Sequence, residues 1–170
     1  MSGSTTFETL HDLLNDFTFA MLVSERYEDG GLNGRPMTLV DVDDDGEITF
    51  LTRVDTQKVD EVLRRPQVEV TFQSGMRFAS IGGIARVERD EDALEAIWKP
   101  SYDTWIPEGP SDPRAAFIRV KPQHGQFWDY GAKNFFELAI DKAKAFFTDD
   151  EVDVTNRTHG TVDFDARSVS

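Results

Sequence analysis

The sequence contains no cysteine, which excludes disulfide bonds, thiolate catalysis and cysteine-ligated metals. No apolar run approaches the roughly 20 residues of a membrane-spanning helix, and no basic and apolar leader marks a secretory signal. Basic residues are also few: 18 Lys and Arg stand against 32 Asp and Glu, for a formal net charge of −14 at pH 7. This charge repels nucleic acids and anionic membranes, so we expect neither as a partner. We expect a cytoplasmic protein.

The remaining composition suits one globular domain. The chain has 170 residues, of which 39% are hydrophobic and 13 are Phe, enough for a sizeable core. Apolar periodicity predicts the following elements in the first part of the chain: a helix over residues 7–17, strands over 17–24, 35–42 and 47–52, and a short helix over 56–65. In that short helix, Val59, Val62 and Leu63 are expected to face inward.

The second part of the chain continues the antiparallel pattern. We expect the following elements there: strands over 67–74 and 76–89, a helix over 90–98, a Pro-rich loop over 99–113, closing strands over 115–122 and 124–130, and an amphipathic helix over 134–147. Gly82 and Gly83 lie inside a long strand, where glycine usually marks a bulge or a bend.

This element order indicates an α+β protein built as a mostly antiparallel split β-barrel with peripheral helices. A closed or partly split barrel protects strand edges and explains the paired glycines. We assign residues 1–147 to the barrel domain. Residues 148–170 are acidic and poor in large apolar side chains. We therefore expect a flexible tail there.

The sequence lacks the complete motifs of three common kinds of site. Asp41, Asp43 and Asp45 resemble the start of a calcium loop, but Thr52 stands where the bidentate Glu is needed, and strands rather than helices flank the turn. The three histidines share no metal-ligand spacing. Neither phosphate-binding glycine motif, G-x-x-x-x-G-K-[ST] or G-x-G-x-x-G, occurs. We expect no metal site.

Cations and hydroxyls gather where the strand over 47–52 leads into the next helix. The stretch FLTRVDTQK places Thr52, Arg53, Thr56 and Lys58 at this turn, and the preceding hairpin brings Arg35 toward it. A helix N-terminus adds free N–H groups and the positive end of the helix dipole. The pattern favours a seat for a phosphate dianion, and the alternative is an ordinary solvated turn.

At these residues the sequence resembles the pyridoxamine 5′-phosphate oxidase-like proteins. FLTRVDTQK is similar to their flavin-phosphate signature F-Y-T-x-x-x-S-x-K in the same register, and GRPMTLV is similar to their R-x-M-x-L strand. The later run WIPEGPSDPRAAFIRVKPQHGQFWD resembles the general stress protein branch, with W-F-P-x-G-x-x-D-P, I-x-V-x-P and a Trp-Asp pair. The resemblance covers residues 7–130 in order and spacing.

The resemblance implies a split barrel that binds FMN, with FAD as the alternative, at a homodimer interface. At the phosphate end it implies that Arg35 and Lys58 hold the phosphate. It also implies that Thr52 and Thr56 form hydrogen bonds to the phosphate and that Gln57 lies beside it.

At the ring end the resemblance implies that Met37 and the backbone at Phe50 and Leu51 pack along the flavin. It implies that Trp128 closes the site from the partner subunit and that Trp105 lies in a loop beside the pocket. The cations that grip pyridoxal phosphate in the true oxidases are missing, so a phosphorylated vitamin is not expected as substrate.

The function that the resemblance implies is an FMN-dependent oxidoreductase with a stress-related role and a small-molecule electron donor and acceptor. No catalytic side chain is required, because the flavin carries the chemistry. Two alternatives stay open: a non-catalytic protein that sequesters or senses flavin, and a binder of deazaflavin or haem on the same fold.

Overall fold

The computed structural model describes residues 2–130 and 158–165. The expected helix over 134–147 and the first part of the expected tail, 148–157, lie outside these residues. The described elements are α1 (Ser2–Asn15), β1 (Phe19–Glu25), β2 (Leu32–Val42), β3 (Ile48–Arg53), α2 (Gln57–Arg64), β4 (Gln67–Ser74), β5 (Arg77–Glu88), α3 (Glu91–Ile97), the 3-10 helix η1 (Pro100–Thr104), β6 (Ala115–Asp129) and β7 (Thr158–Asp163). No helix in these two ranges is long and apolar enough to cross a membrane.

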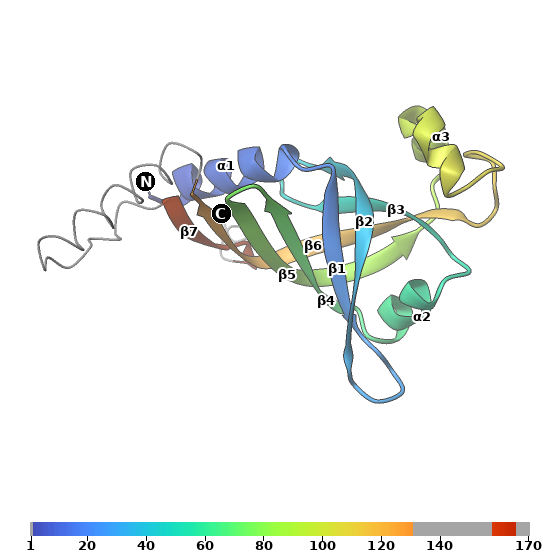
Figure 1. The fold of residues 1–170 in the computed structure, drawn as a ribbon, viewed down its shortest axis with the longest axis horizontal. Coiled ribbons are helices and arrows are strands. Elements are labelled where there is room, and N and C mark those ends of the chain that lie inside the picture. The colour runs from blue at the N-terminus through green and yellow to red at the C-terminus, as the bar shows by residue number, and fades with distance from the viewer. Residues whose placement is uncertain (1, 131–157, 166–170) are drawn as a thin grey trace, which may run out of the picture.

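The strands form an antiparallel barrel. Their order is β3-β2-β1-β4-β5-β6-β7, and an additional pairing between β3 and β6 closes the first six into a ring. Side chains alternate between the inside and the outside, as in β1, where Ala20 and Leu22 are buried and Phe19 and Met21 are exposed. The α+β split barrel predicted from the sequence is confirmed (Figure 1).

One long strand replaces the two closing strands that the sequence predicted. β6 runs without a break because its register with β5 shifts between Gly82 and Gly83, so that Gly82 pairs with His124 and Gly83 with Pro122. Gln123 is the extra residue of this bulge. A Cβ atom at Gly83 would collide with the Lys121 carbonyl oxygen, so this position requires glycine.

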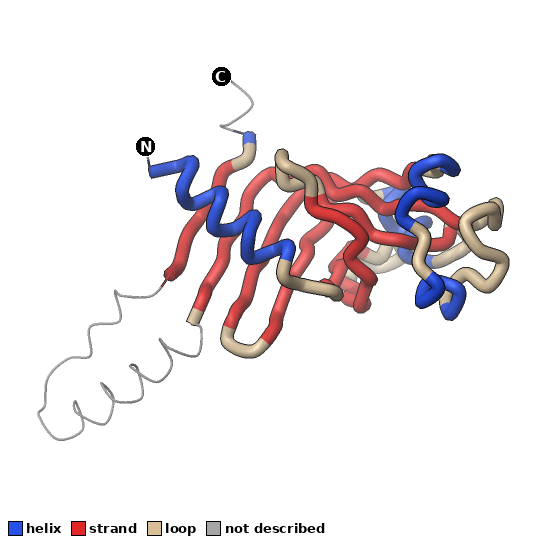
Figure 2. The backbone as a smooth tube through the Cα atoms, turned by 90° about the horizontal axis from the view of Figure 1, so that it is seen from above, coloured by secondary structure: helices blue, strands red, loops and turns tan. Residues whose placement is uncertain are grey.

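The main core fills the barrel and continues under α1. Its fully buried members include Leu22, Phe50, Phe72 and Ile81 inside the barrel, and Leu10 from α1. Figure 2 shows α1 crossing the strands at the end where β7 lies. This arrangement seals one end of the barrel with apolar side chains.

A second, smaller core lies outside the barrel, where α3 and η1 cover β3 and the start of β6. Its buried side chains are Leu51, Leu94, Tyr102, Ile106 and Phe117, with Ala115 at its edge. Figure 1 shows α3 and α2 toward the end of the barrel opposite β7. The chain around Ile106 is thereby held against β3, which positions the site described below.

The prediction of a flexible tail is wrong for residues 158–163. These residues form β7, which pairs with residues 124–129 of β6. Val162 and Phe164 are buried, and the Phe164 ring packs edge-on against Phe7 of α1, with centroids 5.7 Å apart. One large apolar side chain in the strand and one directly after it are sufficient here, because α1 and β6 already provide the surface that they cover.

We expect Phe164→Ala to lower the free energy of unfolding by about 3 kcal/mol, because it leaves a cavity under α1. Denaturant unfolding of the purified variant measures this loss. Leu63→Ala is the control: Leu63 is 65% exposed, so its truncation should change stability by less than about 0.5 kcal/mol. An equally small loss for Phe164→Ala would mean that β7 adds nothing to the fold.

Candidate functional site

A cavity of about 430 Å³ opens where β2, β3 and the start of α2 meet the chain at Trp105 and Ile106. Its apolar lining includes Met37, Leu51 and Ile106, and its polar lining includes Thr52 and Lys58. A smaller cavity of about 240 Å³ shares Thr56 and Lys58 with the first one and adds Arg35 and Gln57. Two adjoining spaces, one mainly apolar and one polar, therefore meet at the N-terminus of α2.

Arg35 is held by a buried hydrogen-bond network. Its Nη1 donates to the Ser24 hydroxyl at 2.6 Å and its Nη2 donates to Glu61 Oε2 at 2.5 Å. The Ser24 hydroxyl itself donates to Glu61 Oε2 at 2.6 Å, and the Asn33 amide donates to Oε1 at 3.2 Å. The network connects β1, β2 and α2 and fixes the direction of the guanidinium group.

Glu61 is ionised at neutral pH although it is only 2% exposed. Burial acts to raise the pKa of this carboxyl, but the hydrogen bonds from Ser24, Asn33 and Arg35 outweigh burial and lower the pKa below its ordinary value. A carboxylate with a lowered pKa stabilises the fold above its unfolded-state pKa. That contribution is lost as the pH falls through the folded-state pKa.

Arg53 is also paired. Its guanidinium donates to both carboxylate oxygens of Asp55, with Nε at 2.9 Å and Nη2 at 2.6 Å, and this lowers the pKa of Asp55. Both side chains are partly exposed, so a ligand or solvent can compete for the pair.

Lys58 differs from both arginines because it pairs with no carboxylate of the described residues. Its partial burial, together with repulsion from Arg35 and Arg53, lowers the pKa of the ammonium group. It lies in the first turn of α2. The Thr56 hydroxyl donates to the Arg53 carbonyl oxygen at 2.8 Å and does not cap the helix. The Val59 N–H donates to the Thr56 carbonyl oxygen at 3.0 Å, so the N–H groups of this turn that stay open to a ligand or to water are those of Gln57 and Lys58.

The arrangement suits an anion next to a planar apolar group. The model of the family described as pyridoxamine 5′-phosphate oxidase like matches residues 5–153. This chain belongs to that family. A comparison with curated proteins finds no match.

Solved structures agree with the family. A Jannaschia protein that carries the name general stress protein 26 has 25% identity and a TM-score of 0.72, covering 94% of this chain and 99% of that one. A general stress FMN/FAD binding protein from Xanthomonas citri has 29% identity and a TM-score of 0.64, covering 76% of this chain and 92% of that one. A general stress family protein from Xanthomonas campestris pv. campestris has 30% identity and a TM-score of 0.61, covering 74% and 90%.

The structure brings together most of the residues that resemblance to the pyridoxamine 5′-phosphate oxidase-like family pointed to. Those that line one or both cavities are Arg35, Met37, Leu51, Thr52, Thr56, Gln57 and Lys58. Trp105, expected in a neighbouring loop, lines the larger cavity with a largely exposed ring. The Phe50 side chain lies in the barrel core, so only the backbone of this residue is available to face a ligand.

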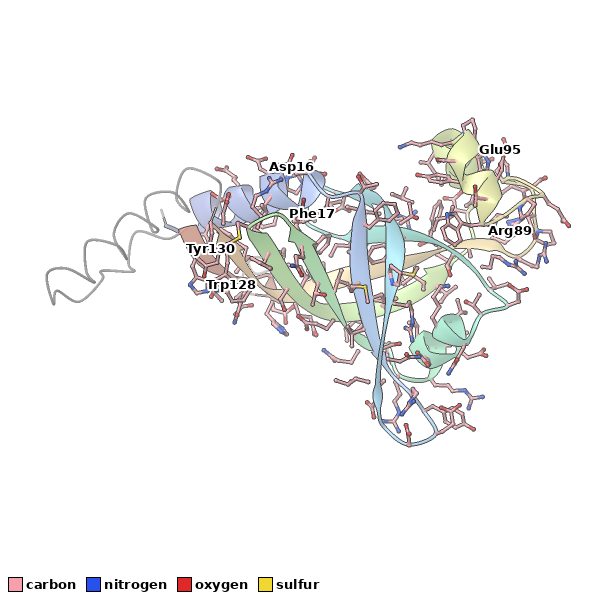
Figure 3. The ribbon with its side chains drawn as sticks, viewed as in Figure 1. Asp16, Phe17, Arg89, Glu95, Trp128 and Tyr130 are labelled. Atoms are coloured by element: carbon pink, nitrogen blue, oxygen red, sulfur yellow. The ribbon has the colours of Figure 1, made fainter. Side chains whose placement is uncertain are left out.

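Trp128 is the exception. It lies near the end of β6, where its ring stacks on His159 of β7 with centroids 5.2 Å apart. Figure 3 shows Trp128 and Tyr130 beside β7, away from α2. Within one chain of this family member, Trp128 therefore does not reach the cavity.

Glu61 was missed in the sequence, and Leu63 was placed on the wrong face of α2. Leu63 was expected to face inward from α2 but is exposed, and Glu61 is buried in its place next to Val59 and Val62. The register of α2 against β1 decides which of these residues lies inward. No signal in the sequence identifies Glu61 as the partner of Arg35, because the pair joins α2 to β2 and exists only in the folded chain.

We expect the ammonium group of Lys58 to titrate below the usual range of lysine, and Arg53→Gln to raise its pKa by removing one of the two repelling cations. An NMR titration of the lysine side chains, with Lys58 assigned through Lys58→Arg, measures both values. Arg86→Gln, which removes an arginine that binds Glu47 outside the cavity, should leave the Lys58 pKa unchanged. The explanation fails if Arg53→Gln does not alter the titration of Lys58.

Proposed function

We propose that the protein binds FMN in the larger cavity and is an FMN-dependent oxidoreductase with a role in general stress. The observation that carries the proposal is Lys58, a partly buried cation without a carboxylate partner in the described part of the chain. It lies beside the Thr52 and Thr56 hydroxyls and the first turn of α2. A phosphate dianion needs donors of this kind, and the Thr56 hydroxyl would turn to it from the Arg53 carbonyl oxygen.

The donor set and the cavity both fit this cofactor. The volume of about 430 Å³ falls within the range of small-molecule sites, and its walls of Met37, Leu51 and Ile106 suit a flat ring system. Arg35 keeps N–H groups beyond the two that it gives to Ser24 and Glu61, and it faces the smaller cavity next to Lys58. A bound flavin supplies hydride and electron transfer, while the protein binds and orients it.

The relatives support a flavin rather than another ligand. The Xanthomonas citri protein is described as binding FMN or FAD, which makes FAD the alternative to FMN here. A deazaflavin with a phosphate would use the same seat, whereas haem offers two carboxylates and no phosphate.

The site is proposed to lie between two copies of the chain. Phe19 and Met21 project outward from β1 and are largely exposed, and Met21 pairs with Pro36, which lines the larger cavity. An apolar surface that continues into a cavity is typical of an interface. In a symmetric dimer, Trp128 of the partner subunit would complete the site that its own chain leaves open.

The first experiment is the visible absorption spectrum of the purified protein before and after incubation with FMN. Flavin bands that persist through gel filtration would support the proposal, and a flat spectrum without uptake would contradict it. Mixing the loaded protein with NAD(P)H or another defined donor then separates the two functions. Rapid reduction supports an oxidoreductase, whereas retention without electron exchange supports a flavin-sequestering protein.

We expect Lys58→Ala to weaken FMN binding by at least about 1.5 kcal/mol, roughly tenfold, because a charge-assisted contact to the phosphate is lost. Quenching of flavin fluorescence measures the affinity. Lys121→Ala removes the same charge outside this cavity and should have no effect. Riboflavin, which lacks the phosphate, should bind Lys58→Ala and the wild type equally well, and an unchanged FMN affinity would remove Lys58 from the site.

We expect Trp128→Ala to weaken flavin binding with little change in the melting temperature of the apo protein. The subunit arrangement is tested by refolding Trp128→Ala together with Lys58→Ala. If each site uses Lys58 of one chain and Trp128 of the other, half of the dimers are mixed and about a quarter of all sites are intact. No recovery of tight binding would place Trp128 in the site of its own chain or outside the site.

A further inference from the structure

We call the proposed phosphate-binding site, formed by Arg35, Arg53, Lys58 and the first turn of α2, the phosphate seat. Its net positive charge is smaller than the sequence suggests. Three cations surround it, but Arg35 is paired with Glu61 at 2.5 Å and Arg53 with Asp55 at 2.6 Å, which leaves Lys58 without a partner among the described residues. The phosphate of FMN carries close to two negative charges at neutral pH. The seat therefore offers a phosphomonoester one uncompensated positive charge.

The two acids differ in how easily a ligand can displace them. Asp55 is exposed, and its pair with Arg53 lies at the surface. Glu61 is buried, and it accepts three hydrogen bonds, from Ser24, Asn33 and Arg35. A carboxylate held in this way has no route to solvent when an anion approaches. Arg35 therefore meets any ligand with its charge already offset.

We propose that Glu61 is a specificity-determining counter-charge of the phosphate seat: it offsets Arg35 and thereby weakens the binding of doubly charged phosphate esters. This inference depends on the proposed function, since it assigns a role within the same site. Arg35 then contributes directed N–H groups and little net charge, while Lys58 supplies the attraction. A singly charged phosphate, such as one within a diphosphate bridge, is disfavoured less than a monoester dianion.

Glu61→Gln separates this role from a purely structural one. The amide oxygen can still accept from Ser24 and Arg35, and the Asn33 amide can turn its oxygen toward the new NH2 group, so the shape of the network is kept while its charge is removed. The apo protein should melt at a lower temperature, because Arg35 loses its ionic partner. If Glu61 acted only to position Arg35, Glu61→Gln would leave FMN binding unchanged or weaken it, whereas the counter-charge role predicts tighter binding.

The experiment compares the dissociation constants of FMN, FAD and riboflavin for the wild type and Glu61→Gln. We expect FMN to bind the variant about three- to tenfold more tightly, FAD to gain less, and riboflavin to be unchanged, because removal of the negative charge beside Arg35 acts on the charge of the phosphate, which riboflavin lacks. Glu47→Gln is the matched control. It removes a carboxylate that binds Arg86 at 2.6 Å outside the cavity, and it should change none of the three affinities.

Equal or weaker FMN binding by Glu61→Gln overturns the inference. A second comparison covers the case in which this variant does not fold. Arg35→Met leaves the Glu61 charge unbalanced at the seat, whereas Arg35→Met with Glu61→Met removes both charges, a replacement that folded proteins often tolerate. The single variant should bind FMN more weakly than the double variant, and equal affinities would overturn the inference.

The outcome can be separated from that of the proposed function. If the wild type takes up no flavin, the proposed cofactor is wrong, and the same variants are titrated with inorganic phosphate alone, followed by NMR. Tighter phosphate binding by Glu61→Gln would then support the counter-charge role without the flavin. Unchanged phosphate affinity, or no phosphate binding by either protein, would overturn the counter-charge role of Glu61 as well as the proposed cofactor.

Discussion

The pairing of β3 with the first half of β6 is the constraint on which the rest of this structure depends. It closes the barrel, with Leu51 opposite Phe117 and Thr52 opposite Ala116, and thereby fixes where β3 ends and α2 begins. A helix that starts at a fixed point presents its first turn in a fixed direction. The same pairing holds Leu51 against the small outer core, so one ladder of hydrogen bonds sets both the polar and the apolar end of the cavity.

The cations at the N-terminus of α2 have different roles because they differ in their ionic partners. An arginine whose guanidinium is bound to a buried acid is rigid and close to neutral as a pair, so it gives direction to a contact rather than strength. A partly buried lysine without such a partner does the opposite, since its compact charge is available but less strictly directed. Arg35 gives direction to a contact with an anion, and Lys58 gives it strength. Glu61, the acid that causes this difference by pairing with Arg35, belongs to the same helix as Lys58.

Much of the barrel could be predicted from the sequence, because alternation along β1, β4 and β5 reports directly which face is buried. Local patterns could not show β7, since Val162 in the strand and Phe164 just after it are too few to predict a strand without the surface that they cover. The orientation of α2 could not be predicted from the sequence for a related reason. In eight residues, Leu63 and Glu61 can exchange places with a small rotation, and packing against β1 decides between them. The cations of the site were visible in sequence, but their partners were not.

Lys58, which pairs with no carboxylate among residues 2–130 and 158–165, belongs to a chain with a net charge of −14. At long range an approaching anion meets a repulsive field, and only within a few ångströms does it experience the local attraction. Dissolved salt screens the distant repulsion more strongly than contacts inside a partly buried pocket. Raising the salt concentration should therefore increase the association rate of an anionic ligand, whereas it lowers that rate for a basic binding protein. The site is thus better suited to high salt than to dilute buffer.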